Sequence, residues 1–172
     1  MLNDEHFVPR AQGLALDTDP KCFGEFLDSS SLLSDPEALR SRMTESGYLF
    51  LRGFFEREQV LAARRTVVDR MDAKGWLAPG TEPMEGILRE GLSLSFEPSL
   101  GENNVELEEL LYAGRLMEFY RAFFGEDVLH FDYTWFRAVG PGFGTPPHCD
   151  VVYMGRGTRE RLFTTWVQGN FI

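Results

Sequence analysis

Two residues in this sequence, His148 and Asp150, have the types and spacing to bind one metal ion. They stand in the segment 145–153, whose Val-Val-Tyr ending favours a β-strand. Successive side chains of a strand point to opposite faces, so the imidazole and the carboxylate are expected on one face and Cys149 on the other. Their Cα atoms would then lie about 6.6 Å apart. Both side chains can reach a single ion from that separation.

The same triplet also has a plain structural interpretation, in which His148 and Asp150 form the partly exposed start of a strand after a Pro-Pro turn. Short motifs often occur by chance, so the triplet alone favours this interpretation. Together with a distant second histidine, however, the two residues would form the facial triad of non-haem Fe(II) oxygenases. That triad leaves open positions on the metal for a cosubstrate and oxygen.

The neighbouring segments support the chemical interpretation. Residues 128–139 are rich in aromatic and β-branched side chains and predict a strand, and the Gly- and Pro-rich residues 140–144 predict a loop after it. Residues 162–167 predict a further strand. The His-x-Asp triplet is therefore expected in the middle of three consecutive strands.

This arrangement resembles the phytanoyl-CoA dioxygenase family of Fe(II)- and 2-oxoglutarate-dependent oxygenases. The resemblance runs from about residue 34 to 167, and the segments that carry it are 47–55, 140–142, 147–150 and 164–167. It implies an α+β fold in which N-terminal helices flank a double-stranded β-helix, a cupin-like jelly roll. It also implies Fe(II) bound by His148 and Asp150, 2-oxoglutarate as cosubstrate, and hydroxylation of a small organic substrate.

The resemblance gives roles to three further residues. Trp166 matches a tryptophan that lines the cosubstrate pocket of the family, and Tyr133 aligns roughly with a residue that contacts 2-oxoglutarate. Cys149 stands where the family often has a glutamine beside the cosubstrate. Aromatic strand residues usually build core, so Trp166 and Tyr133 keep a structural alternative. The carboxylate of Asp150 fits hydroxylation, since halogenating relatives lack it.

The sequence departs from the family pattern after residue 167. The family continues with strands that carry a distal histidine and an arginine for 2-oxoglutarate, whereas here no histidine follows His148 and no basic residue follows Arg161. We therefore expect an incomplete barrel with exposed strands, which favour self-association. A non-catalytic fragment or a strand-edge interaction module is the alternative to an enzyme. His130 is a candidate third ligand, although a lone strand histidine is more often structural.

Helices are expected in the first part of the chain. Helix 36–46 has a Ser-Asp-Pro start and a glycine end, and helices 56–74 and 105–124 show apolar residues near 3.6-residue spacing. A strand is expected at 48–51, and the long segment 76–104, with a strand-like 92–96, is expected to be a functional loop or lid. The arginines of helix 56–74 are interpreted as a solvated face, with an acidic substrate as the alternative. They are Arg57, Arg64, Arg65 and Arg70.

Length and composition predict a single domain, with a helical half over about 1–125 and the start of the jelly roll over about 126–172. The net charge of −10 disfavours nucleic acid and anionic membranes as partners. The two cysteines show no pairing pattern, and the sequence shows neither a signal peptide nor a long apolar run, so a cytoplasmic location is expected.

Overall fold

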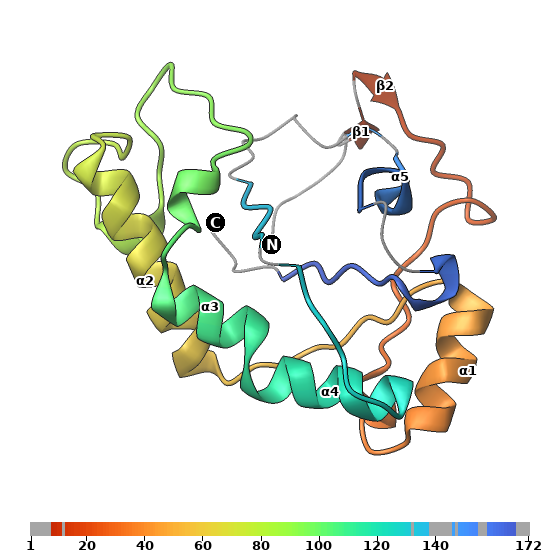
Figure 1. Ribbon diagram of the computed structural model, residues 1–172. Helices are drawn as coiled ribbons and strands as arrows, with labels where there is room; N and C mark the ends of the chain where they lie inside the picture. Colours follow the sequence, from red (N-terminus) through yellow and green to blue (C-terminus); the bar gives the residue numbers. More distant parts are fainter. Residues whose placement is uncertain are drawn as a thin grey trace.

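Helices build most of the regular structure in this computed structural model, which describes residues 8–11, 13–131, 133–137, 146, 148–154 and 158–167. The α-helices are α1 (Pro36–Ser46), α2 (Arg57–Ala73), α3 (Val105–Tyr112), α4 (Gly114–Phe124) and α5 (Asp150–Met154). The 3₁₀ turns are η1 (Ser30–Leu32), η2 (Pro83–Glu85), η3 (Pro98–Leu100) and η4 (Arg159–Arg161). Strands β1 (Arg10–Ala11) and β2 (Leu14–Ala15) form a small antiparallel hairpin. Figure 1 shows α2, α3, α4 and α1 following one another around one side of the molecule, with the C-terminal segments inside the curve.

Helix α1 confirms the predicted helix over 36–46. The Asp35 side chain accepts hydrogen bonds from the backbone N–H groups of Glu37 and Ala38, at 3.1 and 3.0 Å. Pro36 occupies the first helical position, where its missing N–H costs nothing. Gly47 ends the helix with φ 76°, a conformation that a β-carbon would resist. Local chemistry alone therefore sets both ends of α1.

Helix α2 confirms the second predicted helix, and its apolar face builds the main core. Val67, Val68 and Met71 are buried in one cluster with residues of the following segment, namely Leu77, Leu94 and Leu100. Each fully buried aliphatic side chain of this kind contributes roughly 1.5–3 kcal/mol relative to an exposed one. Segment 76–104, which was predicted to be a functional loop or lid, therefore contributes buried side chains to the core.

The sequence predicted that the arginines of α2 form a solvated face, and this prediction is wrong for Arg64 and Arg70. The Arg70 guanidinium donates hydrogen bonds to the carbonyl oxygens of the η3 region, at 2.6 Å for Glu102 and 2.8 Å for Asn103. Arg64 donates to the carbonyl oxygen of Met84 at 2.5 Å. The guanidinium groups satisfy loop carbonyls and thereby hold the segment 76–104 against α2. Arg57 is exposed, as expected.

The helix predicted over 105–124 is two helices, α3 and α4. Ala113 between them is extended (φ −136°, ψ −177°), and Gly114 begins α4 with φ 48°. Glycine accepts this positive φ at little steric cost. Gly114 was the only local signal of the break, because the apolar residues continue on both sides of it.

The strands expected from β-rich sequence differ most from the structure. Residues 151–153 lie in helix α5, so the strand predicted there is wrong. In the described ranges, 48–51, 92–96, 128–137 and 162–167 also form no strands, and only isolated bridges join Asp28 to Phe50 and Phe96 to Arg137. The loop 140–144 and Asp132 lie outside the described residues. Strand propensity depends on cross-strand partners, which these segments lack here. The jelly roll itself stays a prediction.

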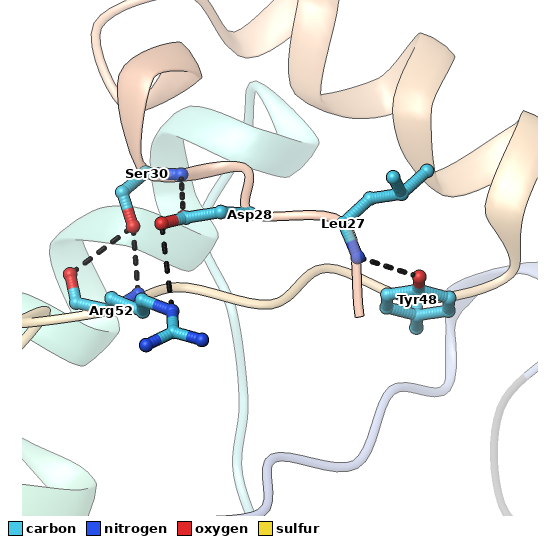
Figure 2. A network of polar contacts seen from close by, with 5 residues as sticks. All are labelled: Leu27, Asp28, Ser30, Tyr48 and Arg52. Carbon is cyan, nitrogen blue, oxygen red and sulfur yellow. Dashed lines mark hydrogen bonds and ion pairs between the residues drawn. The ribbon is translucent and has the colours of Figure 1, made fainter. Parts of the chain in front are cut away.

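A polar network replaces the strand expected at 48–51 (Figure 2). The backbone N–H of Arg52 donates to the Ser30 hydroxyl at 2.7 Å. The same hydroxyl donates in turn to the Arg52 carbonyl oxygen at 3.1 Å. The backbone N–H of Leu27 donates to the Tyr48 hydroxyl at 3.0 Å. Hydrogen bonds from Ser30, followed by the nearby Arg52 guanidinium, hold the pKa of Asp28 below its usual value. This network fastens the N-terminal segment 27–30 to the chain after α1.

The extended C-terminal segments pack on the helices. Phe136 packs against both buried clusters, and Val167 packs against the second cluster, formed by Ala63, Leu107 and Leu110. The Phe163 ring makes edge contacts with the rings of Phe123 and Phe124 on α4, with centroids 5.4 and 5.2 Å apart. These contacts place residues 133–137 and 162–167 on the helical layer. None of the helices in the described ranges is long and apolar enough to cross a bilayer.

Candidate metal-binding site

His148 and Asp150 come together at the start of α5. The Nε2 atom of His148 lies 3.1 Å from the Oδ1 atom of Asp150, and both side chains are about one-third exposed. Asp150 is the first residue of the helix, and the Cys149 carbonyl oxygen accepts the Val152 N–H at 3.1 Å. The two side chains therefore meet at a helix start, and not on one face of a strand as predicted from the sequence. Their role as metal ligands stays a prediction.

The backbone carbonyl of Pro146 orients the imidazole. His148 Nδ1 lies 2.7 Å from the Pro146 oxygen, and a carbonyl can only accept, so Nδ1 carries the proton of this hydrogen bond. In the neutral ring, Nε2 then has a free lone pair directed to the Asp150 carboxylate. Metal-binding histidines commonly use their second ring nitrogen in this way.

A cation between His148 and Asp150 would relieve the repulsion between their electron-rich atoms. Two ligand atoms that lie ~2.1 Å from one ion, at right angles, are about 3.0 Å apart. The observed separation of 3.1 Å between Nε2 and Oδ1 matches this value. A proton on the imidazole would also satisfy the pair. The donor set, one imidazole nitrogen and one carboxylate oxygen, fits a non-haem Fe(II) ion.

Thr164 is a site residue that sequence reasoning missed. Its hydroxyl donates a hydrogen bond to Oδ2 of Asp150 at 2.5 Å, across fourteen residues of sequence. This leaves Oδ1 facing the imidazole. Thr164 belongs to the segment 164–167 that carries the family resemblance, two positions before Trp166. Its place in that segment was the only hint in the sequence that Thr164 could belong to the site.

An aromatic recess lies beside the His–Asp pair. It has a volume of about 330 Å³ and is lined by Phe131, Tyr133, Trp135, Tyr153 and Met154. The Tyr153 ring makes an edge contact with the His148 ring at a centroid distance of 6.0 Å, and it contacts Trp135 at 6.2 Å. The described lining contains no charged side chain. The recess is suited to an apolar molecule next to the pair.

The three residues expected to contact 2-oxoglutarate do not all lie beside the His148–Asp150 pair. Tyr133 lines the aromatic recess, with its ring 6.2 Å from that of Trp135. Cys149 is exposed and carries a free thiol between the two candidate ligands. Trp166 is 76% exposed, and no contact in the described part of the chain joins it to the pair. The cosubstrate roles of all three stay predictions.

The candidate third ligand, His130, lies in another environment. Its ring stacks on Tyr112 with centroids 4.4 Å apart, and its Nδ1 atom lies 3.1 Å from the Phe131 carbonyl oxygen. It lines a separate pocket of about 630 Å³ with Met117 and Arg121. Among the residues that the structure describes, no group of three His, Cys, Asp or Glu side chains is placed to hold one ion. His6 lies outside them.

Comparison with known proteins identifies hydroxylases as relatives. The chain is 30% identical over 152 residues to "1-deoxypentalenic acid 11-beta-hydroxylase" of Streptomyces arenae, which covers 84% of this chain and 52% of that protein. It is 29% identical over 150 residues to the protein of the same name from Streptomyces exfoliatus, covering 83% and 52%. The chain thus spans about half the length of the curated relatives it matches. No protein-family profile and no solved structure matches it.

Proposed function

We propose that this chain contributes the His-x-Asp part of the metal site of a non-haem Fe(II)- and 2-oxoglutarate-dependent oxygenase of the phytanoyl-CoA dioxygenase type. The enzyme would hydroxylate a small organic substrate. The observation that carries the proposal is the 3.1 Å separation of His148 Nε2 and Asp150 Oδ1. The other polar atom of each side chain, His148 Nδ1 and Asp150 Oδ2, already has a hydrogen-bond partner. The hydroxylase names of the relatives support the reaction class.

In this proposal, His148 and Asp150 would hold the iron, and the Pro146 carbonyl, by accepting from Nδ1–H, would leave the Nε2 lone pair of the neutral ring for it. Iron held there together with 2-oxoglutarate would supply the oxidising chemistry for an unactivated C–H bond, which side chains alone cannot perform. The recess around Tyr153 and Trp135 would bind the apolar body of the substrate next to the pair.

The third ligand and the cation for 2-oxoglutarate are expected from residues other than those the structure brings together here. Two protein ligands hold iron less tightly than three. We therefore expect the 172-residue chain alone to bind Fe(II) weakly and to produce little succinate from 2-oxoglutarate. A further histidine and an arginine would complete the site.

An anaerobic titration of the purified chain tests this function. Fe(II) is added first and 2-oxoglutarate second, while the weak visible charge-transfer band of the ternary complex is followed. We expect Fe(II) binding that is lost in His148→Ala and in Asp150→Asn. The matched control is His130→Ala, which removes a histidine from the separate pocket and should bind like the wild type. Wild-type binding in His148→Ala would refute the site.

Turnover gives a separate measurement. Succinate formation by the chain alone, well above that of His148→Ala, would show that a third ligand is already present and would contradict the expected weak activity. Succinate at the level of His148→Ala, together with His148-dependent Fe(II) binding, is the expected result.

A further inference from the structure

We propose that Thr164 is a positioning residue of the metal site: its hydroxyl fixes the Asp150 carboxylate so that Oδ1 is the oxygen presented to the metal. This inference rests on the proposed function of the His148–Asp150 pair. It adds a residue outside the His-x-Asp triplet, and it assigns separate roles to the two oxygens of one carboxylate.

The two carboxylate oxygens of Asp150 have different partners. Oδ2 accepts the Thr164 hydroxyl hydrogen at 2.5 Å, and Oδ1 faces His148 Nε2 at 3.1 Å. An ionised carboxylate only accepts, so the hydroxyl must be the donor. O–H···O⁻ bonds at this length are charge-assisted and are among the stronger hydrogen bonds of proteins.

Without this donor, the contact with His148 remains, but it does not select one of the two carboxylate oxygens of Asp150. The terminal torsion of an aspartate is broad and roughly two-fold, so either oxygen can turn toward the imidazole. The side chain is about one-third exposed, and water can compete for both oxygens. The Thr164 hydroxyl removes this equivalence, which pre-organises one oxygen for the ion before it binds.

Thr164 is itself held in place by its neighbours on the other side of an extended segment. Phe163, Thr165 and Val167 all contact the helical layer: the rings of Phe163 and Phe124 are 5.2 Å apart, and the Thr165 hydroxyl lies 2.5 Å from the Tyr120 hydroxyl. In an extended chain, alternate residues point to opposite sides. The side chain of Thr164 is therefore directed away from the helices, toward Asp150.

The segment 162–167 thus connects the helical layer to the metal site. Figure 1 shows this segment, in blue, passing between α4 and the region of α5. Helix α4 holds it through Phe163 and Thr165, and Thr164 transmits this placement to Asp150 through one hydrogen bond. Partners that orient metal ligands in this way typically change metal affinity by 10–100-fold when they are mutated.

Mn(II) binding to the purified 172-residue chain tests the inference, with free Mn(II) measured by electron paramagnetic resonance. Thr164→Val keeps the shape of the side chain and removes the donor, so Mn(II) affinity should fall about tenfold or more. Thr164→Ser keeps the hydroxyl and should stay close to the wild type. Thr44→Val is the matched control: it removes a threonine hydroxyl that donates to the Arg40 carbonyl within α1 and not to Asp150, and it should retain wild-type affinity.

The inference is overturned if Thr164→Val binds Mn(II) like the wild type, or if Thr164→Ser loses as much affinity as Thr164→Val. Far-UV circular dichroism checks that each variant is folded. If Thr164→Val does not fold, Thr164→Ala takes its place in the same Mn(II) measurement. The proposed function fails separately, if Mn(II) binding to the wild type is absent or is unchanged in His148→Ala. Binding that requires His148 but ignores Thr164 refutes only the role of Thr164.

Discussion

Replacing Asn104 with alanine should destabilise the helical layer more than an ordinary helix cap does. Asn104 is the N-cap of α3 and is only 1% exposed. Its Oδ1 atom accepts from the Leu107 N–H at 3.2 Å and from the Thr66 hydroxyl at 2.9 Å, and its Nδ2 atom donates to the Leu100 carbonyl at 3.3 Å. One side chain therefore joins α3, α2 and η3.

The magnitude follows from these contacts. Loss of an N-cap costs about 1 kcal/mol. Here the Leu107 N–H is buried and would stay without a partner, so losing this cap costs roughly 1–3 kcal/mol instead. The lost hydrogen bond from Nδ2 to the Leu100 carbonyl adds about 1 kcal/mol. The Thr66 hydroxyl keeps its bond to the Ala63 carbonyl at 2.7 Å, so it adds little. We expect Asn104→Ala to lower the free energy of unfolding by about 2–4 kcal/mol in total.

Asp35→Ala is the matched control, because Asp35 caps α1 on the exposed surface. Water can replace its side chain, so the loss should be about 1 kcal/mol. Urea unfolding followed by circular dichroism measures both variants. For a chain of this size, each 1 kcal/mol corresponds to a shift in melting temperature of roughly 2–4 °C. Equal losses in the two variants would refute the reasoning that burial makes the Asn104 cap more costly.

Two further predictions concern acid stability and association. The pKa of Asp28 is lowered in the fold, so its contribution to stability is present at neutral pH and is lost as the pH falls through that lowered pKa. Asp28→Asn should therefore flatten the acid limb of a plot of unfolding free energy against pH. An unchanged acid limb would contradict this. The chain should also self-associate through exposed apolar side chains of its C-terminal segments, such as Trp166 and Val152, and a compact monomer at tens of micromolar in analytical ultracentrifugation would count against it.

Helices α1 and α2 could be predicted because their signals are local. Asp35, Pro36 and Gly47 act within one turn of the helix ends, and apolar spacing along α2 marks the buried face. The division between α3 and α4 was harder to predict. Alanine favours helix, and only Gly114 indicated a change of backbone direction.

The environment of the arginines and of the β-rich segments could not be predicted in the same way. Arg64 and Arg70 bind carbonyl groups that lie twenty or more residues later in the chain. The Val-Val-Tyr run after Asp150 has strand propensity, but that propensity is satisfied only beside a paired strand, and these residues form α5 instead. Both outcomes depend on which distant segments pack nearby.

The sequence by itself determined the candidate metal ligands, because the two-residue spacing of His148 and Asp150 allows their side chains to meet in more than one backbone conformation. Only the tertiary structure decided what surrounds them. The Thr164 hydroxyl reaches Asp150 because Phe163 and Thr165 pack on α4, and the recess beside His148 forms because separate segments bring their aromatic rings together. Such contacts join residues far apart in the chain, and they exist only once the helical layer has formed to receive those segments.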